Sequence, residues 1–318
     1  MYNWMTGLRD LLAPEPRMHI VMSASTRPDH AERTELMPKA HTAFAAEPVL
    51  RLDLFGPLRA HVGSEVVIGE HFTRRKAKAL LALLYLERGR YIPRDELIER
   101  LWPNQEELHA DSGRLKQTVL VLRRALEGRS SRRTGWRYII ERDGTYYFNT
   151  QVAYMCDLED FEHELQQAYA DRQVGDAEAA LAHFQRAFAL RRSELLPEFR
   201  YDDWAGGHIA AEREQCLQAL EDAARLYGAR GDHTRAIELL KRAVREDPLR
   251  ESSALQLMEW LALKRDKAEA LRVYGRLRDV LASRLQLEPD PQITALYHAI
   301  RRDRSVDDLN GPGLSAAS

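Results

Sequence analysis

The sequence predicts a mainly α fold with a small β component, and three observations support this prediction. Alternating apolar and polar residues with glycine turns occupy 49–68 and 136–149, a pattern typical of short antiparallel strands. Between these runs, three segments carry apolar residues at helical spacing. From residue 151 onward the periodicity is helical, and near-repeats appear. We therefore expect a module of antiparallel strands, three helices and a hairpin, joined to an all-helical repeat module.

The composition is that of an ordinary globular protein with two or three domains. The chain has 318 residues, of which 44% are hydrophobic and 30% are charged. Cys156 and Cys216 lack the spacing of a metal site, so we expect buried thiols in a reducing cytoplasm. No apolar run approaches the roughly 18 residues of a membrane span, and the first residues lack a signal-peptide pattern. We expect a cytoplasmic protein without a membrane partner.

Charge is distributed unevenly along the chain. Residues 50–150 contain 19 Lys and Arg against 13 Asp and Glu, a net charge of +6. Residues 151–318 contain 23 against 30, a net charge of −7. The first module is therefore suited to approach a polyanion, and the second is not.

Composition also predicts where order begins and ends. Residues 1–48 contain five prolines that interrupt any long element, so we expect a flexible leader. Residues 305–318 end in GPGLSAAS and have the composition of a disordered tail. The ordered modules are expected to occupy 49–150 and 151–304.

The first module begins with two or three short antiparallel strands. Apolar and polar residues alternate over 50–54, and turns are expected at Gly56 and Gly63. A helix follows, for which Thr73 is the expected N-cap and Gly89 lies just past the end. These elements supply the framework of the module.

A second helix is expected over 93–102. Pro93 lies at or near its first position, and Asp95 and Glu96 lie in the first turn, where acidic side chains are favourable. Trp102 belongs to its apolar side, and Pro103 ends it.

A third helix over 109–126 has two distinct faces. Its apolar residues recur at i, i+4, i+7 and i+11 and form one stripe: Leu115, Val119, Leu122 and Leu126. The opposite face has no carboxylate and carries Gln117, Val121 and Arg124, flanked by Arg114, Lys116, Thr118 and Arg123. Such a face suits a groove of phosphates and base-edge acceptors. For this helix taken alone, a solvated face is the alternative.

The run WRYIIERDGTYYF at 136–148 predicts a β-hairpin that turns at Asp143-Gly144. Strands, three helices and a hairpin in this order predict a winged helix-turn-helix. In that arrangement the helix at 110–126 lies in the major groove of DNA, and the wing at 136–149 lies near the minor groove.

The first module resembles the OmpR/PhoB-type winged helix, in the version found in SARP-type antibiotic regulatory proteins. The residues that carry the resemblance are LIERLW at 97–102 with Pro103, and LKQTVLVLRRAL at 115–126. The similarity covers roughly residues 50–150.

The second module contains three near-repeats: GDAEAALAHFQRAF at 175–188, GDHTRAIELLKRAV at 231–244 and RDKAEALRVYGRLR at 265–278. Ala236 and Ala270 are separated by the tetratricopeptide period of about 34 residues. Small residues at such positions let paired helices pack closely. The module, from DLEDF at 157–161 through YDDW at 201–204 to LEPDP at 287–291, resembles the bacterial transcriptional activator domain, which follows the winged helix in that family.

We expect the third helix to supply the base contacts. Gln117 offers an amide to an adenine edge, and Arg124 or Arg114 reaches guanine or phosphate. Thr118 and Val121 are positioned for a thymine methyl group. These residue types match the acceptors and the methyl group of the major groove.

Four further residues of the winged helix are expected to act outside the base contacts of the major groove. Lys116 and Arg123 lie nearer the buried flank, and for each a phosphate contact and a structural ion pair remain open. Arg142, at the hairpin tip, is expected to enter the minor groove. Leu120 points outward and packs against either the wing or a neighbouring protomer.

A basic cluster, Arg74, Arg75 and Lys76, lies at the start of the first helix. Cations are unfavourable there because the helix dipole is positive at that end. A DNA phosphate bound at the helix N-terminus would offset this cost. The alternative is an exposed basic turn.

The loop at 103–113 contains Glu106 and Glu107. The resemblance implies that this loop contacts RNA polymerase. Solvated loop charge explains the same two residues equally well.

The motifs of catalysis are missing from the sequence. It contains no GxxxxGK[ST], no GxGxxG after a strand, no HExxH and no GxSxG. His163, His183 and His208 lack metal-type spacing. We expect no enzymatic activity, no cofactor and no metal.

The features together predict a sequence-specific DNA-binding transcriptional regulator, an activator that recruits RNA polymerase. We expect two protomers to associate on tandem half-sites of double-stranded DNA. The first alternative is a tetratricopeptide-like scaffold whose winged helix binds protein. The second is a ligand-sensing helical domain that regulates DNA binding, with an unknown protein or small molecule as effector.

Overall fold

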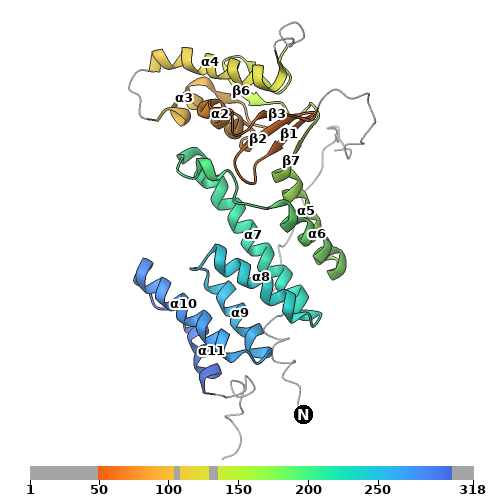
Figure 1. Cartoon of the computed structure of the whole chain (residues 1–318), viewed down its shortest axis with the longest axis vertical. Coiled ribbons are helices and arrows are strands. Elements are labelled where there is room, and N and C mark those ends of the chain that lie inside the picture. Colours follow the sequence, from red (N-terminus) through yellow and green to blue (C-terminus); the bar gives the residue numbers. More distant parts are fainter. Residues whose placement is uncertain (1–48, 104–107, 129–134, 303–318) are drawn as a thin grey trace, which may run out of the picture.

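The computed structural model describes residues 49–103, 108–128 and 135–302, which form two parts (Figure 1). Two small sheets and helices α2 to α4 make a module at one end, and helices α5 to α11 extend away from it (Figure 1). The mainly α fold with a small β component is confirmed. Within the described ranges, no helix is both long enough and apolar enough to cross a membrane.

Three antiparallel strands open the first part. They are β1 (Leu50–Asp53), β2 (Arg59–Val62) and β3 (Glu65–Ile68). Leu52 lies opposite Ala60, and both are buried, so alternate residues face the core. The strands expected over 49–68 are confirmed.

A fourth strand, β7 (Tyr154–Cys156), pairs in parallel with β1 and completes a sheet of order β3-β2-β1-β7. The expectation of helices alone after residue 150 was wrong at this point. The strand has three residues, too few for alternation to appear, and it forms because a distant edge is available for pairing. Its position ties the start of the helical part to the first sheet.

Helix α2 (Arg75–Leu86) is the central helix of the module, and its residues from Ala77 to Leu86 are buried. Thr73 is not its N-cap. Arg74 takes that position without a side-chain cap, and the carbonyl of Thr73 accepts the Arg75 N–H at 3.0 Å. The Thr73 contact to the first turn is therefore made by its backbone and not by its hydroxyl.

Helix α3 (Arg94–Leu101) follows β4 (Ile92–Pro93), which pairs with β6. Pro93 is the N-cap, one position before the helix. The helix ends before Pro103, as the sequence predicts. The two-residue β4 was not predicted, because it exists only through its pairing with the distant hairpin.

The predicted wing is present as β5 (Ile139–Arg142) and β6 (Thr145–Phe148). Asp143 and Gly144 have φ of 50° and 75°, the positive values that a type I′ turn requires. Helix α4 (Leu108–Glu127) holds the wing at its base, because the Glu127 carboxylate accepts the Arg137 and Tyr138 N–H groups at 3.0 Å.

The helical part consists of α5 (Asp157–Gln173), α6 (Ala177–Leu190), the short 3-10 helix η2 (Pro197–Phe199), α7 (Asp203–Ala229), α8 (His233–Glu246), α9 (Glu251–Leu263), α10 (Lys267–Leu285) and α11 (Pro291–Arg301). The near-repeats are α6, α8 and α10. Each begins after an aspartate N-cap whose carboxylate accepts backbone N–H groups: Asp176, Asp232 and Asp266. The repeat alanines Ala180, Ala236 and Ala270 are fully buried, which confirms the close helix packing.

The two parts are joined by backbone and side-chain contacts around the segment after β1. Asp157, the first residue of α5, accepts the N–H groups of Leu54 and Phe55 at 2.8 and 3.0 Å. The Leu196 N–H donates to the Leu54 carbonyl at 2.9 Å. The rings of Phe55 and Phe161 meet edge to face at 5.3 Å. The apolar residues of both parts form one continuous core.

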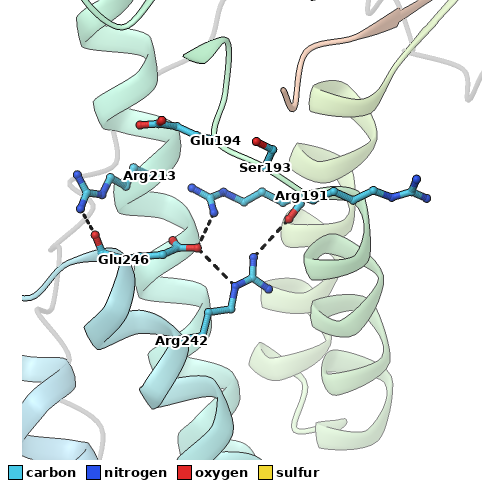
Figure 2. A pocket seen from close by; sticks show the side chains of 7 residues that line it. Arg191, Ser193, Glu194, Arg213, Arg242 and Glu246 are labelled. Atoms are coloured by element: carbon cyan, nitrogen blue, oxygen red, sulfur yellow. Dashed lines mark hydrogen bonds and ion pairs between the residues drawn. The ribbon is translucent and has the colours of Figure 1, made fainter. Parts of the chain in front are cut away.

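A buried ionic network ties α6, α7 and α8 together beside a cavity of about 530 Å³ (Figure 2). The Arg191 side chain is 6% exposed, and its Nε lies 2.5 Å from Glu212 on α7, whose side chain is 4% exposed. Its Nη1 lies 2.8 Å from Glu246 on α8. Arg242 also contacts Glu246, at 3.4 Å, and donates to the Arg191 carbonyl (Figure 2).

Replacing Arg191 with methionine should lower the free energy of unfolding by roughly 3–5 kcal/mol, because Glu212 then remains buried without its partner. The double variant Arg191→Met/Glu212→Leu should recover most of the loss, since no uncompensated charge is left. Urea unfolding measures both, with Arg192→Met at the exposed neighbouring position as control. A double variant as unstable as the single one contradicts this account.

Glu259 on α9 has a carboxyl group with an unusual pKa. Burial raises the pKa of Glu259 to about 7, and the charge of Arg225 only partly opposes the rise. Between the ordinary glutamate pKa and this value, the folded protein binds more protons than the unfolded chain, so stability is lost as pH rises toward 7. Glu259→Gln should remove this pH-dependent loss. The difference in the free energy of unfolding between the variant and the wild type should therefore shift by about 1–3 kcal/mol in favour of the variant from pH 4 to pH 8.

The measurement is the midpoint of urea unfolding between pH 4 and pH 8. Glu238→Gln, at an exposed position of the neighbouring helix α8, is the matched control and should parallel the wild type. Parallel curves for Glu259→Gln and the wild type would show that the burial of Glu259 does not affect its titration.

Candidate nucleic-acid interface

Helix α4 has the two faces that the sequence predicts. Leu115, Val119, Leu122 and Leu126 are each at most 2% exposed and contribute to the core of the module. The helix packs against α2 and α3. Lys116, Gln117 and Arg124 lie exposed on other sides of the helix. The apolar stripe is therefore confirmed, and it leaves the amide and the cations accessible.

The outward face of α4 and the beginning of α2 together line an open groove of about 710 Å³. It contains seven of the residues predicted to contact DNA: Arg74, Arg75, Lys76, Arg114, Gln117, Thr118 and Val121. The remaining lining residues are Thr73, Ala77, Trp102 and Gly113, so the lining side chains that the structure describes include no carboxylate. The groove presents four cationic side chains and one amide, a combination suited to phosphates and base edges.

Two groove residues have partly defined roles within α4 itself. The Thr118 hydroxyl donates to the Arg114 carbonyl one turn earlier, at 2.8 Å. This bond occupies its proton and leaves the methyl group for an apolar contact. Val121 is partly buried against the core. Both observations are compatible with the predicted contact to a thymine methyl group.

Arg75 is engaged by the helical part. Its Nη2 lies 2.5 Å from Oδ2 of Asp202, and its Nη1 lies 3.4 Å from Oδ1 of the same carboxylate. In this structure a carboxylate of the YDDW segment supplies the anion beside Arg75, and the predicted phosphate contact of Arg75 stays a prediction. Residues 75 and 202 are too far apart in sequence for any local pattern to reveal the pair.

Lys76 is also partly satisfied within the module. Its Nζ donates to the Leu101 carbonyl and lies 5.9 Å from the centre of the Trp102 ring. Burial, followed by the charge of Arg75, lowers the pKa of Lys76. Arg74, by contrast, is exposed. Of the basic cluster, Arg74 is the residue best presented to an external phosphate.

Arg123 contacts the wing, a role that the sequence did not indicate. Its Nε donates to the Ile139 carbonyl at 2.9 Å, and its guanidinium lies 5.4 Å from the centre of the Trp136 ring. Burial lowers the pKa of this guanidinium. Arg123 therefore holds the wing against α4 through a backbone hydrogen bond made by its Nε, and its phosphate contact stays a prediction.

The remaining predicted contacts lie outside the groove. Lys116 and Arg124 are exposed on α4. The Arg142 side chain is 73% exposed at the wing tip, with Asp143 at 3.6 Å. Leu120 is partly buried. The interface is thus a central groove with further cations beside it.

Some sequence expectations concern residues outside the described ranges. They are Glu106 and Glu107 of the polymerase-contact loop, the leader over 1–48 and the tail over 305–318. Among the residues that are described, no cluster of His, Cys, Asp or Glu side chains has the arrangement of a metal site.

Two residues at the interface were missed by sequence reasoning. Trp102 was assigned to the buried side of α3, yet it is only partly buried and lines the groove. Asp202 was noted only as part of YDDW. A tryptophan at the end of a short helix was the available signal for the first, and nothing local indicated the second.

Comparison with known proteins agrees with this geometry. Residues 71–147 match the family described as "Transcriptional regulatory protein, C terminal", and residues 156–301 match "Bacterial transcriptional activator domain". The chain is 26% identical over 272 residues to the regulatory protein DnrI of Streptomyces peucetius, covering 85% of this chain and 98% of DnrI. It is 28% identical over 266 residues to the transcriptional regulatory protein MoaR1 of Mycobacterium tuberculosis, covering 82% of each.

The fold is similar to that of Mycobacterium tuberculosis EmbR, solved in complex with a low-affinity phosphopeptide. The TM-score is 0.66 at 25% sequence identity, and the match covers 82% of this chain and 67% of EmbR. Both family matches occur in the expected order, and they coincide with the two parts of the fold. The chain therefore joins an OmpR/PhoB-type winged-helix DNA-binding domain to a bacterial transcriptional activator domain, the organisation of the SARP-type transcriptional regulators.

Proposed function

We propose that this regulator is an activator that binds tandem DNA half-sites as two associated protomers and recruits RNA polymerase. DNA binding is assigned to residues 49–150, with 110–126 in the major groove and Arg142 near the minor groove. Residues 151–304 are assigned to assembly and regulation. The protein acts on chromosomal DNA in the cytoplasm and performs no catalysis itself.

The observation that carries the proposal is the groove between α2 and α4. It gathers Arg74, Arg114 and Gln117 from two helices around one open groove, and the side chains described in its lining include no carboxylate. Phosphate contacts from the cations would fix the register of the duplex, and Gln117 would read a base edge. A protein-binding surface has no need for such a uniform sign of charge.

Footprinting of the purified protein on the DNA upstream of its own gene tests the proposal. We expect two protected half-sites whose centres are about one helical turn apart, roughly 10 base pairs. Protection should survive competitor DNA at moderate salt. Absence of any such site would overturn the assignment of the groove.

Gln117→Ala and Arg124→Ala should each weaken binding to the protected site by about 1–3 kcal/mol if the residue contacts a base. The loss should be smaller on non-specific DNA, because base contacts carry the discrimination. Gln166→Ala and Arg284→Ala, at exposed positions of the helical part, are the matched controls. If the winged helix is instead a protein-binding scaffold, Gln117→Ala and Arg124→Ala leave DNA binding unchanged.

The polymerase contact is proposed for the loop with Glu106 and Glu107. The double variant Glu106→Gln/Glu107→Gln should retain the footprint and lose activation in a run-off transcription assay, because it removes two charges that a basic polymerase surface would pair. Glu65→Gln/Glu70→Gln serves as a control of equal charge change on the same module. Full activation by the loop variant would place the polymerase contact elsewhere.

A further inference from the structure

Arg75 connects the groove with the helical part. It lies at the first position of α2 and lines the groove together with Arg74 and Gln117. Its two terminal nitrogens both face the Asp202 carboxylate, at 2.5 and 3.4 Å. A guanidinium binds a phosphate through the same fork of N–H groups that it uses for a carboxylate. The fork of Arg75 is therefore occupied by Asp202 and is not presented to DNA.

The segment that holds Arg75 is anchored independently of the ion pair. The ring of Phe199 is fully buried, and the Arg75 guanidinium lies 5.3 Å from its centre. Glu198 accepts the Leu58 N–H at 3.3 Å, and its carboxylate lies 3.8 Å from Lys78. Asp202 thus stays beside the groove even when Arg75 is removed.

The strength of the pair determines whether DNA can compete for Arg75. The side chain of Arg75 is 53% exposed and that of Asp202 is 20% exposed. Ion pairs with this degree of solvent contact are weak, and salt screens them further. The phosphate backbone of DNA is a dense array of negative charge. The Arg75–Asp202 pair is therefore a weak one, and we expect its effect on DNA affinity to be modest.

We propose that Asp202, a residue of the helical part, sets the DNA affinity of the winged helix by competing with a DNA phosphate for Arg75. This inference rests on the proposed function of the groove. In this structure, the Asp202 carboxylate accepts hydrogen bonds from both terminal nitrogens of Arg75. Breaking the Arg75–Asp202 pair releases Arg75 to the phosphate backbone. The helical part thereby controls DNA binding through one shared side chain.

Asp202→Asn in the intact chain tests the proposal. Asparagine has nearly the same shape, and the Asp202 side chain makes no capping hydrogen bond at the start of α7, so the replacement should leave the fold unchanged. On the footprinted site, the dissociation constant should fall about 3- to 10-fold. The plot of log affinity against log salt should steepen by about 0.9, the value for one additional phosphate contact. Asp202→Ser, a second replacement that removes the charge, should behave alike.

Two controls separate competition from a general charge effect. Asp203→Asn removes the same charge at the next, exposed residue and should change affinity and slope much less. Arg75→Gln should bind DNA nearly as the wild type does, because Arg75 is already held. In the double variant Arg75→Gln/Asp202→Asn, the gain should disappear.

The outcomes are distinguishable from those of the groove assignment. If Asp202→Asn equals Asp203→Asn, or if the gain persists without Arg75, the competition is refuted while the DNA site stands. Weaker binding by Asp202→Asn would mean that Asp202 orients Arg75 toward the phosphate, which also refutes the proposal. If the wild type protects no site, the groove assignment fails and this inference fails with it.

Discussion

The arrangement of this regulator depends on the contacts that dock the segment after β1 onto the helical part. The carboxylate of Asp157 accepts hydrogen bonds from the N–H groups of Leu54 and Phe55. Without it, these two backbone donors would be shielded from water and left without a hydrogen-bond partner. Burial raises the pKa of Asp157, and these two hydrogen bonds oppose the rise. The docking also brings the YDDW segment to the first turn of α2. The position of the DNA-binding groove relative to the helical repeats follows from it.

The winged helix and the helical part share residues as well as a boundary. Strand β7 of the second part extends the sheet of the first, and one core runs through both. In such an arrangement a displacement in the helices reaches the groove through packed contacts and not through a flexible linker. Arg75 pairs with Asp202 of the helical part, so a displacement of these helices would reach its guanidinium directly. A helical domain fused in this way is suited to regulate DNA binding.

Much of the fold could be predicted because it depends on local patterns. The stripe of Leu115 and Leu122, the turn at Asp143-Gly144 and the aspartate caps of the repeat helices are properties of neighbouring residues. The groove cations could also be named, because the charge of α2 and α4 is visible in the sequence. Three features that the sequence did not indicate share one cause: β7, the bond of Arg123 to the wing and the pair of Arg75 with Asp202 each join residues that are distant along the chain.

The sequence by itself determined the class of fold, the faces of α4, the repeat character of the second part and the choice of DNA as partner. Hydrophobic periodicity, turn residues and the distribution of charge encode these features locally. Tertiary structure decided which cations are accessible. Arg74 and Lys116 are exposed, whereas Lys76, Arg123 and the equally exposed Arg75 bind groups within the protein. A side chain's partner depends on which distant groups packing brings within hydrogen-bonding distance, and no local pattern specifies that.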